Sequence, residues 1–319
     1  MLRLVKIRDV TSIARTMLRQ KRLVPIAAVL LLATDCTYLK AQTIYIGESY
    51  NTIEAYSANG TDLGVFASGN PQVEEPEGLA ISGSGQLFES DFNNFSIEEF
   101  NSSGAATTFA NSTTGLNDPW GLVFDQSGNL YVANSGLQSI LKYTPDGSVS
   151  TLVSRTIFNA PEAMAIDSSG NLFVNYIATG DDTIEEVTPD GAKTLFCNAG
   201  GSQEIFGLAF GPDGSLYGAD FENNKIYKFL SNGSEQVFAQ SGLDEPTGLA
   251  FDGSGNLYVT NQGNDTVEKF NSQGVGSLFA STGGNQPISI AIAAPEPSSV
   301  SLLIFGLTFA SYCFRKKKC

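Results

Sequence analysis

The chain has 319 residues, 42% of them hydrophobic, and a formal net charge of −15. Positions 42–297 hold six basic residues against 31 acidic ones, and a body with a charge of −25 repels polyphosphate, which argues against nucleic acid binding. The sequence contains no histidine, so any mechanism that needs imidazole as a base, proton shuttle or metal ligand is excluded.

The first 41 residues have the layout of a secretory signal peptide. Three basic residues precede an apolar run at 23–33, and a short stretch ending in Ala41 follows it. We expect signal peptidase to cleave after Ala41, and Met17 is a second candidate for the start of translation. An uncleaved membrane anchor is the alternative, although an apolar run of this length is short for a span. The basic residues are Arg19, Lys21 and Arg22.

A phrase of six residues recurs along the rest of the chain. Its six copies begin 43, 42, 44, 41 and 41 residues apart. A period in this range, filled with short strands and turns, is typical of a propeller blade. The copies are Pro76–Ile81, Pro119–Phe124, Pro161–Ile166, Ile205–Phe210, Pro246–Phe251 and Pro287–Ile292.

Each repeat predicts four short strands. In the copy that begins at Pro119, the expected strands are separated by turns rich in Gly, Asn and Asp, which tolerate positive φ. Four strands in about 42 residues predict an antiparallel up-and-down blade. The expected strands are Gly121–Asp125, Leu130–Ala133, Ile140–Tyr143 and Val149–Val153.

The two ends of the repeat region complement each other. Residues 43–66 supply strands two, three and four of a blade, and the missing first strand returns at Ile288–Ala293. We therefore predict an all-β, six-bladed propeller over residues 42–294, closed by its C-terminal strand. Closure of this kind pairs two strand edges that would otherwise be exposed.

The repeat resembles the NHL family. The likeness lies in Gly128–Asn134 (Gly-Asn-Leu-Tyr-Val-Ala-Asn), which is echoed at Gly255–Asn261. The resemblance implies the propeller fold, and that fold hosts lactonases, lyases and plain binding platforms alike.

The last 25 residues, 295–319, form a third segment. The motif Pro295-Glu296-Pro297 is followed by an apolar stretch and then by a basic cluster, an order that predicts one transmembrane helix with a cytoplasmic end. This order resembles the PEP-CTERM sorting signal of bacterial surface proteins, whose motif is read by a membrane protease of the exosortase type. A plain C-terminal anchor is the alternative. The cluster is Arg315, Lys316, Lys317 and Lys318.

Candidate ligand-binding residues precede the glycine of each first strand. This position should lie at the mouth of the central channel. Two carboxylates and two aromatic rings there could hold a cation or stack a sugar, and packing of the mouth is the alternative. The four candidates are Glu77, Trp120, Glu162 and Phe206, and Thr247 and Ile288 complete the ring.

Two other polar series have simpler interpretations. Residues at the end of the second strands are expected to serve turn chemistry, and aspartates after the first strands are expected to cap hairpins. The single body cysteine, Cys197, is expected to be a buried thiol. The first series is Glu48, Asp91, Asn134, Tyr176, Asp220 and Asn261, and the second is Asp125, Asp167 and Asp252.

We interpret the chain as an exported binding or display module of an extracellular matrix, at the cell surface or outside it. Its expected partners are signal peptidase and exosortase during export, the inner membrane before processing, and a polysaccharide or small ligand. We predict no catalytic residue and no cofactor.

Two other interpretations stay open. Gluconolactonase and regucalcin propellers, which the repeat also resembles, hold a divalent metal at the mouth with Glu, Asn and Asp. Here Trp120 and Phe206 stand where further ligands would be needed, so a divalent cation and a lactonase working through Glu77 and Glu162 are the alternative. Streptogramin lyases, a further resemblance, depend on a histidine that this chain lacks. The last alternative is an inert matrix component.

Overall fold

The computed structural model describes residues 42–69, 73–154, 160–177, 183–198 and 203–293. The predicted signal peptide and the sorting segment lie outside these residues. Within the described ranges, no helix has the length and apolarity to cross a bilayer.

Twenty-four strands form six four-stranded antiparallel sheets, the blades. Blade 1 contains β24 (Pro287–Ile292), β1 (Thr43–Glu48), β2 (Thr52–Ser57) and β3 (Asp62–Ser68). Blade 2 contains β4 (Pro76–Ile81), β5 (Leu87–Asp91), β6 (Ser96–Phe100) and β7 (Ala106–Ala110). Blade 3 contains β8 (Pro119–Phe124), β9 (Leu130–Asn134), β10 (Ser139–Tyr143) and β11 (Val149–Val153).

The remaining blades follow the same order from the inner strand outward. Blade 4 contains β12 (Ala160–Ile166), β13 (Leu172–Ile177), β14 (Thr183–Val187) and β15 (Lys193–Asn198). Blade 5 contains β16 (Ile205–Phe210), β17 (Leu216–Asp220), β18 (Lys225–Phe229) and β19 (Glu235–Ala239). Blade 6 contains β20 (Pro246–Phe251), β21 (Leu257–Asn261), β22 (Thr266–Phe270) and β23 (Gly276–Ser281). Two short 3₁₀ helices, η1 (Ser112–Thr114) and η2 (Ser135–Leu137), lie before β8 and after β9.

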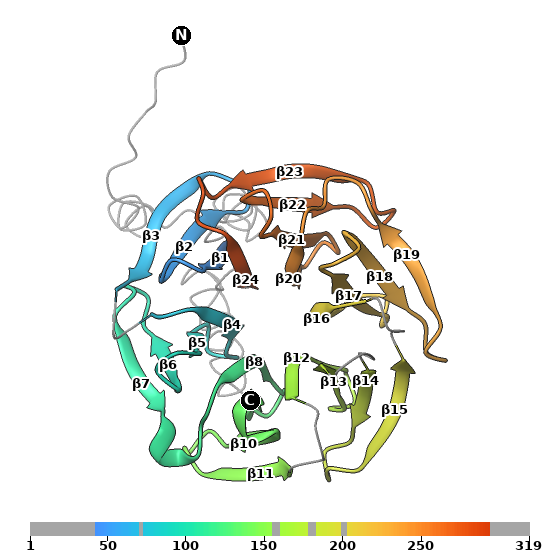
Figure 1. Cartoon of the computed structure of the whole chain (residues 1–319). Helices are drawn as coiled ribbons and strands as arrows, with labels where there is room; N and C mark the ends of the chain where they lie inside the picture. The colour runs from blue at the N-terminus through green and yellow to red at the C-terminus, as the bar shows by residue number, and fades with distance from the viewer. Residues whose placement is uncertain (1–41, 70–72, 155–159, 178–182, 199–202, 294–319) are drawn as a thin grey trace, which may run out of the picture. The chain divides into compact units, whose positions relative to one another are not determined.

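The ring is closed by its last strand. β24 pairs antiparallel with β1, with Ile46 opposite Ile290 and Tyr45 opposite Ala291. The inner strands of neighbouring blades contact one another around the whole circle, as Figure 1 shows. The predicted six-bladed fold and its closure are therefore confirmed.

Glycines in the inner strands set the spacing between blades. A Cβ added at Gly121 would lie 2.5 Å from the carbonyl oxygen of Glu162, and one at Gly207 would lie 2.0 Å from that of Thr247. Only glycine permits such close backbone approach. The residue before each glycine is therefore held at the end of the inner strand, where the channel opens.

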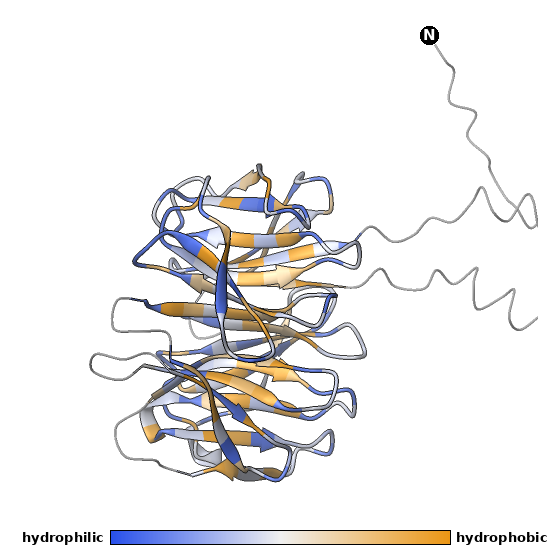
Figure 2. Cartoon of the chain, turned by 90° about the vertical axis from the view of Figure 1, so that its right-hand side faces the viewer, coloured by the Kyte–Doolittle hydropathy of each residue, from blue (hydrophilic) through white to orange (hydrophobic). Residues whose placement is uncertain are grey.

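Apolar contacts between blades form the core. One cluster joins Tyr131 and Ile140 of blade 3 to Met164 and Val174 of blade 4. Figure 2 shows hydrophobic and hydrophilic segments interspersed along the strands, as expected when polar turns separate buried runs. Cys197 is free and 6% exposed, and burial raises the pKa of its thiol to about 11, so this thiol is inert.

In blades 3, 4 and 6 an aspartate holds the first turn by side-chain hydrogen bonds. The Asp125 carboxylate accepts from the amides of Ser127 (2.9 Å) and Asn129 (2.8 Å), and Gly128 between them has a φ of 82°. Asp167 and Asp252 make the equivalent bonds in blades 4 and 6. The hairpin-cap interpretation of these aspartates is thus confirmed.

Candidate functional site: the mouth of the central channel

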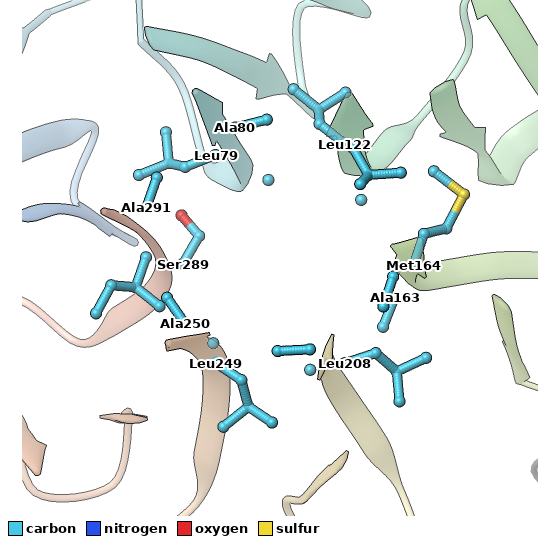
Figure 3. Close-up of a pocket in the computed structure, with 18 of the residues that line it drawn as sticks. Leu79, Ala80, Leu122, Ala163, Met164, Leu208, Leu249, Ala250, Ser289 and Ala291 are labelled. Carbon is cyan, nitrogen blue, oxygen red and sulfur yellow. The ribbon is translucent and has the colours of Figure 1, made fainter. Parts of the chain in front are cut away.

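The central channel is lined mainly by apolar side chains, and Glu77, Trp120 and Phe206 also belong to its lining. The inner strands enclose a cavity of about 410 Å³, and Figure 3 shows leucines from several blades around it, among them Leu79, Leu122 and Leu208. Ser289 also lies there, and its hydroxyl donates to the carbonyl oxygen of Pro76 in the next blade (2.5 Å). The channel walls therefore offer packing surface and few side-chain hydrogen-bonding groups.

A second cavity, which we call the mouth pocket, contains most of the predicted site residues. It has a volume of about 340 Å³. Glu77, Trp120 and Phe206, three of the four candidates, line it together, as do Thr247 and Ile288 from the same repeat position. Its other lining residues are Ser49, Glu75, Gln262 and Gln286.

Aromatic rings form one side of the mouth pocket. The centroids of Trp120 in blade 3 and Phe206 in blade 5 lie 6.2 Å apart. Phe92 contacts the Trp120 ring edge-on at 5.7 Å, and Phe221 contacts Phe206 at 5.0 Å. Such edge and tilted contacts hold rings in fixed orientations. The result is a rigid wall that presents the chain's one tryptophan to the cavity.

Glu162 lies elsewhere than the sequence suggested. It occupies the equivalent position in blade 4, but it is 7% exposed and is not part of the lining of the mouth pocket. Blade 4 stands between the blades that carry Trp120 and Phe206, and these two rings meet beside its inner strand. Glu162 is thus buried, whereas Glu77 at the equivalent position of blade 2 lines the cavity.

Hydrogen-bonding side chains form the other side of the mouth pocket. Four of them, two carboxylates and two carboxamides, are partly or fully exposed and make no side-chain hydrogen bond to another described residue. They are held at the rim by their backbones: the amide of Glu77 donates to the carbonyl of Glu75 (2.9 Å), and the amide of Gln286 donates to Asp265 (2.9 Å). The four side chains are those of Glu75, Glu77, Gln262 and Gln286.

The backbone at this rim has positive φ. Glu75 (φ 52°) and Gln286 (φ 48°) adopt the left-handed conformation, which non-glycine residues rarely do. Glu245 has the same conformation (φ 49°), and its amide likewise donates to a side chain of the preceding blade, that of Asn224. Because the strain recurs with the repeat, it belongs to the joints between blades and is not by itself a sign of a site.

The mouth pocket is acidic. Burial, and then the charge of Glu75, raises the pKa of Glu77 to about 7. None of the described residues that line the pocket is basic. Among the described residues, no three Asp, Glu, Cys or His side chains are grouped to hold a metal ion. The geometry therefore suits a ligand that donates hydrogen bonds.

In the first polar series, at the ends of the second strands, Asn134 and Asp91 hold turns and loops, as expected. Asn134 accepts from the amide of Asn117 (2.7 Å) and donates to the carbonyl of Gly115 (3.0 Å), which ties the loop before β8 to β9. Asp91 accepts from the backbone and side chain of Asn94.

Two features escaped the sequence interpretation. Glu75 and Gln286 precede prolines and line the mouth pocket, which no pattern in the sequence indicates. Glu89 is fully buried, and its two carboxylate oxygens have no hydrogen-bond partner among the described residues. An alignment of the repeats would have revealed it, because the equivalent positions in blades 3, 4 and 6 hold valine.

Comparison with solved structures supports the fold. A chain of the nidogen/laminin complex matches with a TM-score of 0.67 and 20% identity, over 80% of this chain and 100% of that one. Virginiamycin B lyase from Staphylococcus aureus matches with a TM-score of 0.60 and 15% identity, over 81% and 93%. A gluconolactonase from Xanthomonas campestris matches with a TM-score of 0.57 and 19% identity, over 69% and 82%.

No protein-family model and no curated protein matches the chain. At these identities the likeness shows the six-bladed propeller alone, and the similar folds include both enzymes and a protein of a binding complex. A histidine-to-alanine variant of the staphylococcal lyase is catalytically inactive, and the present chain has no histidine.

Proposed function

We propose that this protein is an exported, exosortase-sorted surface or extracellular propeller that binds carbohydrate of the surrounding matrix at the mouth pocket. The observation that carries the proposal is the composition of that pocket. A rigid Trp120/Phe206 wall faces carboxylate and carboxamide groups that have no hydrogen-bond partner among the described residues.

A sugar matches both sides of such a pocket. The C–H face of a pyranose packs on an aromatic ring, and its hydroxyl groups donate to carboxylate and amide oxygens. The cavity of about 340 Å³ is within the range of ligand sites, which begins at about 300 Å³. The polar groups at the rim would then exchange hydrogen bonds with water for hydrogen bonds with sugar hydroxyls.

The proposed localisation rests on the two ends of the sequence. Residues 1–41 read as a signal peptide, and residues 295–319 resemble a sorting signal that is removed at the inner membrane. The strongly acidic body suits a protein that stays soluble outside the cell. Glu296→Ala should leave the protein in the inner-membrane fraction. Release of this variant at the wild-type level would refute the proposed localisation.

Retention on a panel of immobilised polysaccharides tests the ligand. Trp120→Ala removes the larger ring of the wall and should abolish retention of the purified propeller. Leu278→Ala, which shortens a side chain that is 62% exposed on the outer strand β23, is the control and should be retained like the wild type. Unchanged retention of the Trp120→Ala variant would remove the mouth pocket from the proposal.

A metal-dependent lactonase is the second candidate, favoured by the fold shared with a gluconolactonase. It would work through Glu77, with Glu162 as the other carboxylate that the sequence offers. Metal analysis of the purified protein, together with a screen of lactones and esters, separates the two candidates. A bound divalent ion and turnover lost in Glu77→Gln would favour the enzyme.

A further inference from the structure

Resting on the function proposed above, we infer that the sugar recognised by the mouth pocket carries a protonated amine. An amino sugar would place its ammonium group at Glu75 and Glu77 and its ring against Trp120.

The charge of the mouth pocket is the first reason. Glu75 and Glu77 flank one proline, line the same cavity, and lie close enough for the charge of Glu75 to raise the pKa of Glu77. No basic side chain of a described residue lines the pocket to balance them. Two carboxylates held together in a partly desolvated site repel each other, and a cation between them relieves this repulsion. An acidic sugar would add to it.

The hydrogen-bonding capacity of the rim is the second reason. A carboxylate only accepts hydrogen bonds, whereas an ammonium group only donates them, and it has three N–H bonds to give. The side chains of Glu75 and Glu77 make no hydrogen bond to another described residue, so their four carboxylate oxygens can accept all three N–H bonds of one amine. Bonds between two charged groups are also stronger than bonds from a neutral hydroxyl.

The aromatic wall is the third reason. The face of a tryptophan ring attracts a cation, most strongly where water is excluded. Trp120 and Phe206, with centroids 6.2 Å apart, lie in the same small cavity as the two carboxylates. The rings can therefore stack the sugar and also favour its positive charge.

The fluorescence of Trp120 offers a direct assay, because the chain has no other tryptophan. Short oligomers of glucosamine and of N-acetylglucosamine, equal in length, are titrated into the purified propeller at pH 7.5 and physiological salt. The glucosamine oligomer should bind about 10- to 100-fold more tightly, as expected when one charged hydrogen-bonding group is added.

Matched variants locate the contact. Glu77→Gln keeps the shape of the side chain and should lower the affinity for the glucosamine oligomer about tenfold or more, while the affinity for the acetylated oligomer changes little. Glu235→Gln removes the same charge from an exposed position on the outer strand β19 and should leave both affinities unchanged. An equal loss in the two variants would mean attraction to the acidic body as a whole and would overturn the inference.

The outcomes separate this inference from the proposed function. Equal or tighter binding of the acetylated oligomer, or of neutral glucans, overturns the amine preference and leaves carbohydrate binding in place. If no sugar changes the fluorescence and none retains the protein on the polysaccharide panel, the proposed function fails as well.

Discussion

Blades 2 and 4 place different side chains at four equivalent positions that face the preceding blade. Blade 4 has Val174, Tyr176, Glu185 and Lys193, and there Lys193 forms a 2.7 Å ion pair with Glu185 and lies 5.3 Å from the Tyr176 ring. Blade 2 has Glu89, Asp91, Glu98 and Ala106.

At these four positions blade 2 thus has three carboxyl groups and an alanine in place of the lysine. Glu98 accepts from the hydroxyls of Ser96 and Thr108, and Asp91 accepts from Asn94, but the Glu89 oxygens have no partner among the described residues. Burial raises the pKa of all three carboxyls, to about 6 for Asp91 and well above the ordinary value for Glu89. One fold therefore tolerates both arrangements, and the comparison predicts what each contributes to stability.

The largest effect should come from moving the carboxyl group into blade 4. Val174→Glu buries a carboxylate in the apolar cluster between blades 3 and 4, directly opposite Glu185, whose lysine partner is already paired. We expect the free energy of unfolding at pH 7 to fall by roughly 3–5 kcal/mol, measured by urea denaturation. An unchanged free energy of unfolding would show that the interface between blades 3 and 4 excludes water no better than the interface between blades 1 and 2.

The reverse change in blade 2 should stabilise the propeller. Glu89→Val, the residue of blades 3, 4 and 6, should raise the free energy of unfolding by about 1–3 kcal/mol at pH 7, because it removes an unpartnered buried polar group. Glu89→Gln keeps an unsatisfied group and should gain less. A destabilised valine variant would indicate that Glu89 has a partner which this account lacks.

The wild-type propeller should be more stable in mild acid than at neutral pH. The carboxyls of Glu89, Asp91 and Glu98 have raised pKa values, as do Glu48 and Glu77 at about 7, so the unfolded chain ionises first as the pH rises. As the pH rises from the ordinary pKa, near 4, to the pKa in the folded protein, the free energy of unfolding falls. Each group contributes a loss of at most about 1.4 kcal/mol per pH unit.

Aspartates whose pKa values are lowered change the stability only at lower pH. Asp125, Asp213 and Asp252 have lowered pKa values because of their hydrogen bonds, and their contribution is lost below about pH 4. Melting temperatures at pH 5 and pH 8 test the prediction. Wild type should melt lower at pH 8, Glu89→Val should show a smaller difference, and a higher melting temperature at pH 8 would contradict it.

The smallest effect should come from giving blade 2 the cation of blade 4. Ala106→Lys places a lysine at the position of Lys193, within reach of Glu98. We expect a gain of about 0.5–1 kcal/mol at pH 8, as for a partly exposed ion pair, and less at pH 5. The same gain at both pH values would mean that the lysine acts through packing and not through charge.

Much of the architecture could be read from the sequence. The spacing of the Pro-x-Gly phrases, the turns around Gly128 and Gly255, and the return of the first strand near Ile290 all follow from local chemistry and a regular period. The repeat also placed Glu77, Trp120 and Phe206 at the channel opening, because the glycine after each holds the inner strand close to its neighbour.

The rest depends on packing between blades. The contact of Trp120 with Phe206 and the burial of Glu162 follow from the orientation of large side chains that lie far apart in sequence. Glu75 and Gln286 precede proline, where extended backbone is the usual expectation, yet both have positive φ. Their approach to the mouth pocket was therefore not visible in the sequence.

A crystal structure of the propeller with a bound glucosamine oligomer is the most direct test of the central claim that the mouth pocket is the binding site. The account predicts a sugar ring against Trp120 and Phe206, with its amine within hydrogen-bonding distance of Glu75 and Glu77. A sugar bound instead in the apolar channel or on the outer strands would contradict it.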